Sequence, residues 1–310
     1  MSAARRVVAA GYGGPENLVV EELPLPEPGP GQVRVSVRAA GVNPYDAKVY
    51  AVPGDPSRLP IRLGFEAAGT VDAVGPEVSA AVGDEVIAFR ASGAYASDLV
   101  VDQGALTPKP SSLGWAESAG LMLTGAAAWH ALAATAVGEG DTVLVHGASG
   151  GVGLTAVQLA RLRGARVVGT TNPRNDDLLR ELGVEPVAYG EGLLDRVRAL
   201  APEGVDVALD LVGTDEAMDV SLALVGDRSR LVSIANFARA PREGVKLLGN
   251  GPGADPGTEI RDAARPELAR LAGDGSLRVL VASTYPLGKA AAAHRQILTG
   301  HTTGKLVLLP

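Results

Sequence analysis

The chain has 310 residues, enough for two domains of ordinary size, and its 46% apolar and 20% charged residues favour a folded protein over a disordered one. A formal charge of −7 supplies no basic surface for nucleic acid or anionic lipid, so neither partner is expected. The absence of cysteine excludes disulfides, thiolate nucleophiles and cysteine-ligated zinc, and four scattered histidines leave little material for a metal centre.

The first 115 residues or so carry the pattern of a β-rich domain. Short alternating apolar runs, such as Gln32–Arg38, are separated by clusters of proline and glycine. Further strands are predicted at Gly69–Val74 and Asp84–Phe89. The start of the chain lacks the apolar core of a secretory signal peptide, which favours a cytoplasmic protein. We expect a small barrel or sandwich here.

The segment Ala119–Gly138 is free of charged residues and long enough to cross a bilayer. Most of it is Ala, Gly and Thr, however, which is too weakly hydrophobic for a membrane span. A buried, alanine-rich helix is the better interpretation, because small side chains allow neighbouring backbones to approach closely.

From about Trp115 onward, strands and helices alternate, which is typical of a doubly wound parallel sheet. The glycine- and proline-rich segment Ala238–Gly257 is expected to be a mobile loop, and a final helix at Ala290–Leu298 precedes a strand at Gly304–Leu309. The predicted strands are Thr142–His146, Arg166–Thr170, Val205–Asp210 and Arg230–Ile234, and the predicted helices are Val152–Gly164, Asp176–Leu182 and Glu216–Leu224.

The strongest local motif is an apolar strand that runs into a glycine-rich turn and then a helix. The spacing of Gly147, Gly150 and Gly153 departs from the GxGxxG fingerprint. Glycine lets a backbone approach a pyrophosphate, and a helix N-terminus offers free N–H groups and a positive dipole end. Glycines also serve ordinary tight turns, but the strand before and the helix after favour dinucleotide binding.

The end of the next strand predicts which nicotinamide cofactor is used. NAD sites place an acidic residue there to bind the ribose 2′-hydroxyl, whereas this chain has Thr171, Asn172 and Arg174. These side chains suit a 2′-phosphate, which predicts NADPH. The alternative is that Arg174 only begins a solvated helix. Asp176 and Asp177 are expected to favour the helix dipole rather than the ribose.

Taken together, these residues resemble the zinc-independent, zeta-crystallin-like quinone oxidoreductases of the medium-chain dehydrogenase/reductase superfamily. The resemblance implies an α/β protein with a GroES-like β-rich catalytic domain at residues 1–115, completed by about 278–310, and a Rossmann domain at 116–277. The segments that carry it span nearly the whole chain: Ala40–Pro44, Gly64–Val71, Val82–Val86, Leu123–Gly125, Val143–Gly153 and Gly304–Leu308.

The resemblance also implies the positions of the site residues. The position of the zinc-binding histidine of other superfamily members holds Phe65, so no metal is expected. Residues implied to contact the cofactor lie near the nicotinamide (Asn43, Thr124), at the pyrophosphate (Ser149, Gly150, Gly151, Val152), at the 2′-phosphate (Asn172, Arg174, Tyr189) and along the rest of the groove (Ser233, Lys305).

Asn43 and Tyr45 are the candidate catalytic residues. Tyr45 is placed to donate a hydrogen bond or proton to a developing enolate, although it also suits an amphipathic wall of the pocket. Asp46 is expected to cap the adjacent helix. No histidine clusters with a Ser–Asp pair, so hydrolase chemistry is not supported.

The sequence therefore predicts an NADPH-dependent, metal-free oxidoreductase that transfers hydride to a quinone or an α,β-unsaturated carbonyl compound. The alternatives are a dedicated biosynthetic enoyl reductase and a low-turnover NADPH-binding partner protein. A homodimer is expected from the resemblance. The substrate pocket is expected from three loops, Pro53–Pro60, Ala91–Ser97 and Asn236–Gly257.

Overall fold

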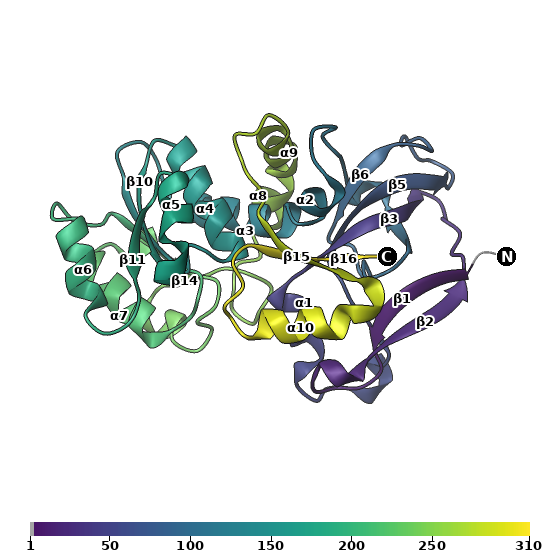
Figure 1. Cartoon of the computed structure of the whole chain (residues 1–310), viewed down its shortest axis with the longest axis horizontal. Coiled ribbons are helices and arrows are strands. Elements are labelled where there is room, and N and C mark those ends of the chain that lie inside the picture. The colour runs from purple at the N-terminus through teal and green to yellow at the C-terminus, as the bar shows by residue number, and fades with distance from the viewer. Residues whose placement is uncertain (1–2) are drawn as a thin grey trace. The chain divides into compact units, whose positions relative to one another are not determined.

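The computed structural model describes residues 3–310 (Figure 1). Cα packing divides the chain into two units. One unit contains the chain up to Leu123 together with Pro266–Pro310, and the other contains Thr124–Arg265. The second unit is thus one continuous segment, inserted between two parts of the first.

The first unit is built mainly from β-strands, as the alternating apolar runs predict. A three-stranded sheet has the order β2-β1-β4, and a larger sheet has the order β15-β16-β3-β5-β6-β8, with β7 also paired to β3. The strands are β1 (Ala3–Ala9), β2 (Leu18–Pro24), β3 (Gln32–Val42), β4 (Ile61–Arg62), β5 (Glu66–Val74), β6 (Glu85–Phe89), β7 (Asp98–Asp102), β8 (Leu106–Pro108), β15 (Val281–Pro286) and β16 (Lys305–Leu309).

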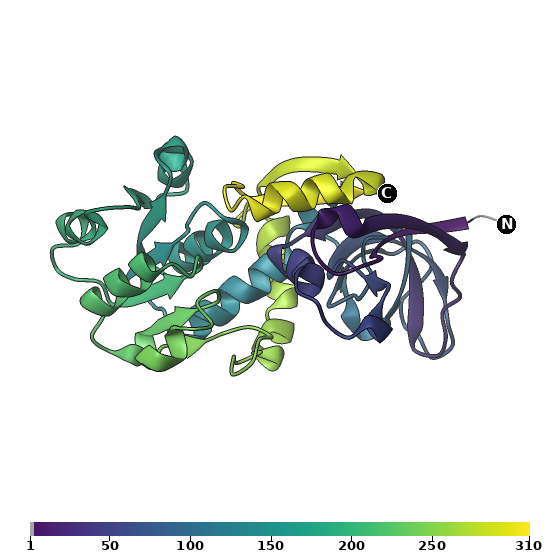
Figure 2. The same ribbon diagram turned by 90° about the horizontal axis from the view of Figure 1, so that it is seen from below.

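The last strand of the chain lies beside one of the first. Strand β16 pairs antiparallel with β3, with Leu306 opposite Val42, and parallel with β15. Figures 1 and 2 show these C-terminal elements in yellow next to the purple N-terminal strands. The register brings Lys305, at the start of β16, close to Asn43, directly after β3.

Among the described residues, four α-helices lie wholly or almost wholly in this first unit and a fifth begins there. Helix α1 follows β3 directly, because Pro44 at its first position suits a helix start and Asn43 caps it. Helix α10 lies exactly where the sequence predicts it. The helices are α1 (Pro44–Ala51), α2 (Trp115–Ala119), α9 (Arg265–Gly273), α10 (Ala290–Leu298) and α3 (Met122–Ala134), which continues into the second unit.

The second unit contains a six-stranded parallel sheet of order β11-β10-β9-β12-β13-β14. This is the strand order of dinucleotide-binding sheets, as predicted. Figure 1 shows α4 and α5 on one side of the sheet and α6 and α7 on the other. The strands are β9 (Thr142–His146), β10 (Arg166–Thr171), β11 (Glu185–Ala188), β12 (Val207–Asp210), β13 (Leu231–Ser233) and β14 (Lys246–Leu247), and the helices are α4 (Gly151–Leu162), α5 (Asp176–Glu181), α6 (Leu193–Leu200), α7 (Asp215–Leu224) and α8 (Thr258–Ala263).

Two segments differ from the sequence prediction in detail. The predicted loop Ala238–Gly257 contains β14, which pairs with β13 and completes the sheet, because the buried Val245 and Leu247 supply an apolar strand between glycine-rich turns. The alanine-rich segment is helical over only 13 residues, Met122–Ala134. Within residues 3–310, no helix is both long and apolar enough to cross a bilayer.

Candidate functional site

In the second unit, the glycine-rich turn packs tightly between β9 and α4. Gly147 has φ +76°, a conformation that strongly favours glycine, and the N–H of Ala148 donates to the Thr170 carbonyl at 3.0 Å. A Cβ added to Gly153 would lie 2.1 Å from the Gly147 oxygen. The turn and the helix can therefore approach this closely only because Gly153 has no side chain.

The beginning of α4 offers an anion-binding site. Gly150 is its N-cap and makes no side-chain cap, so the first N–H groups of the helix, including those of Gly151 and Val152, have no partner within the helix. The Ser149 and Thr171 hydroxyl groups are hydrogen-bonded at 2.9 Å, which ties the turn to the end of β10. These features fit a nucleotide pyrophosphate, held by backbone N–H groups and the helix dipole.

The predicted 2′-phosphate residues lie at the ends of two adjacent strands. Thr171 is opposite Ala188 in the β10–β11 register, so Asn172 and Tyr189 each come directly after the paired residues. The Asn172 side chain accepts a hydrogen bond from the Arg174 N–H at 3.1 Å, and the Tyr189 residue is 49% exposed. The strand end thus carries amide, guanidinium and phenol groups and no carboxylate.

The two nearby carboxylates are occupied elsewhere. Asp176 and Asp177 form ion pairs with Arg180 at 3.2 and 3.0 Å, within and around the first turns of α5. Both also lie at the N-terminal end of that helix, where negative charge is favourable. The expectation that they serve the helix rather than a ribose agrees with this geometry.

Ser233 and Thr124 are also part of the second unit. The Ser233 hydroxyl donates to Asp210 at 2.7 Å and accepts from the Asn236 N–H at 2.9 Å, so its side chain already holds the turn after β13. Its backbone carbonyl accepts from the Leu248 N–H at 2.9 Å, so both the side chain and the carbonyl of Ser233 hold the end of the sheet. Thr124 is buried in the first turn of α3.

In the first unit, Asn43 and Lys305 meet at a buried carboxylate that the sequence analysis missed. The ammonium group of Lys305 forms an ion pair with Glu66 at 2.8 Å and donates to the side-chain oxygen of Asn43. The Asn43 amide in turn donates to Glu66 at 3.2 Å, and the N–H of Leu123 donates to the other Glu66 oxygen at 2.8 Å. Asn43 is thereby held in one orientation.

The available sequence signal for Glu66 was a charged residue directly before the small, apolar run Ala67–Gly69 of its strand. Its side chain is fully buried, and so is most of Lys305. A lone buried charge is strongly unfavourable, so each of these residues requires the other. Lys305, predicted from the resemblance to line the cofactor groove, points its ammonium group at Asn43 and Glu66.

A second buried chain of polar groups begins at Asp46, as part of the helix cap. Its carboxylate accepts from the Asn43 N–H at 2.9 Å, which agrees with the predicted capping role, and from the Tyr95 hydroxyl at 3.1 Å. His294 contacts that hydroxyl at 3.1 Å through Nε2 and the Tyr50 hydroxyl at 2.8 Å through Nδ1. An imidazole with its proton on Nε2 satisfies all of these groups.

Burial shifts the pKa values along this chain. It raises the pKa of Asp46 to about 7, against the opposing effects of the Asn43 and Tyr95 hydrogen bonds. Burial also raises the pKa values of both tyrosines, that of Tyr50 to about 12, and lowers the pKa of His294 to about 4. Near neutral pH the histidine and both tyrosines are therefore uncharged, and Asp46 is close to its titration midpoint. Because Tyr95 and His294 are far from Asp46 in sequence, no local motif predicts this chain of contacts.

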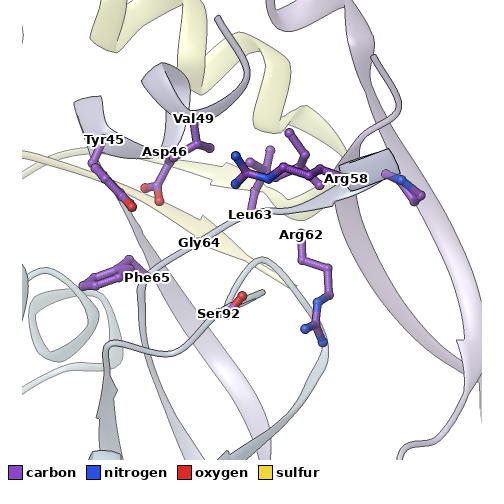
Figure 3. Close-up of a pocket in the computed structure, with 11 residues that line it drawn as sticks. Tyr45, Asp46, Val49, Arg58, Arg62, Leu63, Gly64, Phe65 and Ser92 are labelled. Carbon is purple, nitrogen blue, oxygen red and sulfur yellow. The ribbon is translucent and has the colours of Figure 1, made fainter. Parts of the chain in front are cut away.

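Tyr45 lies at the edge of a pocket of about 390 Å³ in the first unit (Figure 3). Its ring packs edge-on against Phe65 at 5.5 Å between centroids, and its hydroxyl has no hydrogen-bond partner among the residues described. The residue is 43% exposed. In this position Tyr45 can donate a hydrogen bond to a substrate, and it can also serve only as part of the pocket wall.

Two of the three loops expected to shape the substrate pocket do line this one. Arg58 and Pro60 come from the first loop, and Ser92 from the second. Asp46 and Phe65 form other parts of the wall. The third loop, Asn236–Gly257, belongs to the second unit.

The residues around Phe65 do not fit a zinc ion. The chain has no cysteine, and Phe65 packs against the Tyr45 and Phe89 rings. Over residues 3–310, no group of three or more His, Asp or Glu side chains is arranged to hold a metal. Hydrocarbon and aromatic side chains replace the donor set that zinc requires.

A β-rich unit with a buried polar site and a parallel α/β unit with a glycine-rich phosphate turn define the class of two-domain, nicotinamide-dependent oxidoreductases. Two family models match the chain. One, described as an alcohol dehydrogenase GroES-like domain, matches residues 29–111. The other, described as a zinc-binding dehydrogenase, matches residues 182–308.

Individual proteins match over the whole chain. A quinone oxidoreductase of Pseudomonas aeruginosa is 36% identical, over 99% of this chain and all of that protein. The structure of Escherichia coli quinone oxidoreductase complexed with NADPH has a TM-score of 0.87 and 28% identity, and covers 99% of this chain and 100% of its own. The spectinabilin polyketide synthase protein NorB of Streptomyces orinoci is 34% identical over 98% of this chain, which spans 14% of NorB.

The chain therefore belongs to the zinc-independent quinone oxidoreductase family of the medium-chain dehydrogenase/reductase superfamily. It is an NAD(P)H oxidoreductase with a GroES-like domain and a Rossmann domain. The fold and the family predicted from the sequence are confirmed.

Proposed function

We propose that the protein is an NADPH-dependent reductase that transfers hydride to a quinone or an α,β-unsaturated carbonyl compound. The observation that carries the cofactor choice is the end of β10, where Asn172 and Arg174 stand in place of an acidic residue. A guanidinium group binds the 2′-phosphate of NADPH by charge-assisted hydrogen bonds, whereas the NADH ribose would lack its usual carboxylate partner.

The side chains then have distinct roles in this proposal. Ser149, Gly150, Gly151 and Val152 bind the pyrophosphate, and Tyr189 borders the 2′-phosphate with Asn172 and Arg174. Asn43 and Thr124 contact the nicotinamide ring. Ser233 supports the cofactor by holding the turn after β13, and Lys305 supports it by holding Asn43. When bound, the nicotinamide supplies the hydride.

Glu66 and Lys305 fix the orientation of Asn43, and the Asn43 amide already donates a hydrogen bond to Glu66. A fixed amide or a phenol that donates a hydrogen bond to the substrate oxygen stabilises the negative charge that develops there during hydride transfer. We assign this role to Tyr45, whose hydroxyl makes no hydrogen bond within residues 3–310. The proton that completes the reduction comes from Tyr45 or from solvent.

A dedicated biosynthetic enoyl reductase is the second candidate, and the match to a polyketide synthase component favours it. A low-turnover NADPH-binding role, with a protein as partner, is the third. The expected homodimer and cytoplasmic location stay predictions from the resemblance and the N-terminal sequence.

The first test is fluorescence titration of the wild-type protein with NADPH and with NADH, repeated for Arg174→Ala. We expect the wild type to bind NADPH more tightly than NADH. In the variant, we expect the affinity for NADPH to fall about tenfold and the affinity for NADH to stay unchanged, because one charged hydrogen-bonding group at the 2′-phosphate is removed. Arg180→Ala is the matched control, since that side chain pairs with Asp176 and Asp177. Equal or tighter NADH binding by the wild type would contradict the cofactor assignment.

Turnover separates the three candidates. NADPH oxidation is followed with a panel of quinones and short enones. Broad turnover supports the proposed reductase. Turnover of elongated enoyl thioesters alone supports the biosynthetic alternative, and tight NADPH binding without turnover supports the binding role.

A further inference from the structure

Two arginine side chains border the pocket of the first unit, beside Tyr45. Arg58 and Arg62 both line it, together with the apolar side chains of Val49 and Leu63. Figure 3 shows the Arg58 side chain extending toward Asp46 and Val49, and the Arg62 side chain on the side of Ser92. Positive charge thus reaches the pocket from two directions.

Neither guanidinium group forms an ion pair among the described residues. Among residues 3–310, no hydrogen bond and no ion pair involves the side chain of Arg58 or Arg62. Arg34 and Arg230, in contrast, bind Asp72 and Asp141 at 2.9 and 2.5 Å. In a protein with a formal charge of −7, two uncompensated arginines at one pocket are a local exception to the acidic surface.

The carboxylates near the pocket do not neutralise them. Asp46 uses its carboxylate for the Asn43 N–H and the Tyr95 hydroxyl, and burial raises its pKa to about 7. Asp55 caps the short helix that contains Arg58 and accepts from the Ser57 N–H at 2.9 Å. Hydrogen bonds from Ser57 are the main cause of the lowered pKa of Asp55, and the attraction of Arg58 contributes less. The positive charge at the pocket therefore remains available to a ligand.

The pocket has a positively charged wall and an apolar wall, which suits a ligand with an anionic group and a carbon skeleton. Guanidinium groups bind carboxylate and phosphate oxygens in a bidentate manner, which Lys does not reproduce. The Ser92 hydroxyl adds a polar contact on the side of Arg62, and Val49, Leu63 and Phe65 supply apolar contacts for a carbon skeleton.

We propose that this pocket selects substrates that carry an anionic oxygen group, a carboxylate or a phosphate, which Arg58 and Arg62 bind. The inference rests on the proposed function, because it treats the pocket beside Tyr45 as the place of the reducible carbonyl compound. The arginines are specificity-determining residues in this assignment and take no part in hydride transfer.

The experiment compares matched charged and neutral substrates in the wild type and in Arg58→Gln/Arg62→Gln. One pair is β-acetylacrylate and its methyl ester, which tests a carboxylate, and the other is naphthoquinone sulfonate and naphthoquinone, which tests a tetrahedral oxyanion. We expect kcat/KM for the charged member to fall about tenfold or more in the double variant, as lost charge-assisted hydrogen bonds predict, while the neutral member is unchanged. The pair with the larger loss identifies the anion class.

Arg198→Gln is the control, because Arg198 is exposed on α6 of the second unit and does not line the pocket. An equal fall for charged and neutral substrates, or no fall for either charged substrate, overturns the proposal. Equilibrium dialysis of naphthoquinone sulfonate without nicotinamide cofactor provides a readout that needs no turnover. If the wild type reduces none of the four compounds, the proposed function fails. In that case, binding that weakens in the double variant still supports the anion site, and binding that is absent or unchanged overturns it.

Discussion

Asp46 connects the helix cap, the pocket wall and the buried Tyr95–His294–Tyr50 chain. Hydrogen bonds from the Asn43 N–H and the Tyr95 hydroxyl take the place of water around its carboxylate. These contacts favour the ionised form, but the loss of hydration on burial outweighs them, so the pKa rises to about 7. The balance matters near neutral pH, because there a small change in environment changes the charge of the pocket wall.

The raised pKa of Asp46 predicts a pH dependence of stability. The folded protein binds this proton more tightly than the unfolded chain, whose aspartate has the ordinary value of 3.8. The contribution of Asp46 to the free energy of unfolding is therefore full below about pH 4 and is lost as the pH rises through about 7. His294 has the opposite effect, since its pKa is lowered to about 4 and its contribution is lost as the pH falls.

The substitution Asp46→Asn isolates this contribution, because asparagine retains an acceptor oxygen and does not titrate. We expect the variant to gain about 3 kcal/mol in free energy of unfolding relative to the wild type between pH 4.5 and pH 8. Urea unfolding at both pH values measures it. Asp195→Asn, at an exposed position on α6, is the control. A difference that does not change with pH would show that Asp46 titrates at an ordinary pKa.

Among the elements, the turn before α4 has a strict steric requirement. Gly153 faces the Gly147 carbonyl so closely that a Cβ would lie 2.1 Å from that oxygen, a distance that real Cβ atoms do not show. Gly150 differs, because its φ of −75° suits any residue and the nearest atom to its Cβ would be 3.4 Å away. Gly153 thus allows the helix to pack closely on the turn, whereas Gly150 leaves open space at the N-terminus of the helix.

This contrast predicts different results for two alanine substitutions. Gly153→Ala must shift the helix or the turn, so we expect a loss of about 1–3 kcal/mol in free energy of unfolding together with weakened NADPH binding. Gly150→Ala is expected to keep the wild-type stability and to weaken NADPH binding about tenfold or more, because a methyl group separates the N–H groups from the phosphates. Denaturant unfolding and NADPH titration of both variants provide the measurement. Unchanged binding in Gly150→Ala would contradict the pyrophosphate assignment.

On the scale of the whole molecule, the first unit depends on the end of the chain. Strand β16 pairs with β3 and β15, and its Leu306, Val307 and Leu308 are fully buried. It also carries Lys305, the counterion of Glu66. The second unit is formed by the continuous segment Thr124–Arg265 and needs no part of this strand.

Deletion of Lys305–Pro310 should therefore affect the units unequally. Burial of three apolar side chains contributes several kcal/mol, comparable with the whole stability of an ordinary domain, and the deletion also leaves Glu66 buried without its counterion. We expect amide hydrogens of β3 and β5 to lose protection from exchange, while those of β9 and β10 retain it. Deletion of only Leu309 and Pro310, which are partly exposed, is the control. Retained protection in β3 would contradict this account.

Local sequence patterns determined much of the architecture. Periodicity and turn residues are local properties, so they predicted β9 and α10 to the residue and seven other strands (β3, β5, β6, β10, β12, β13 and β16) to within a few positions. The shorter or less regular strands, such as β4, β8 and β11, were not predicted individually. The glycine turn and the strand end at Asn172 were predicted for the same reason, because each lies within one short segment. Strand β14 was missed, since two residues flanked by glycines carry too little periodicity to be distinguished from a loop.

Only the tertiary structure decided which distant residues share a site. The ion pair of Glu66 and Lys305 and the hydrogen bonds among Asp46, Tyr95 and His294 join residues that strand pairing and helix packing bring together. Their charges, orientation and pKa values follow from burial and from these partners, neither of which is a property of a local segment. The sequence by itself thus determined the fold, the family and the nucleotide-binding motif, and the tertiary structure decided how the polar groups around Asn43 are held and charged.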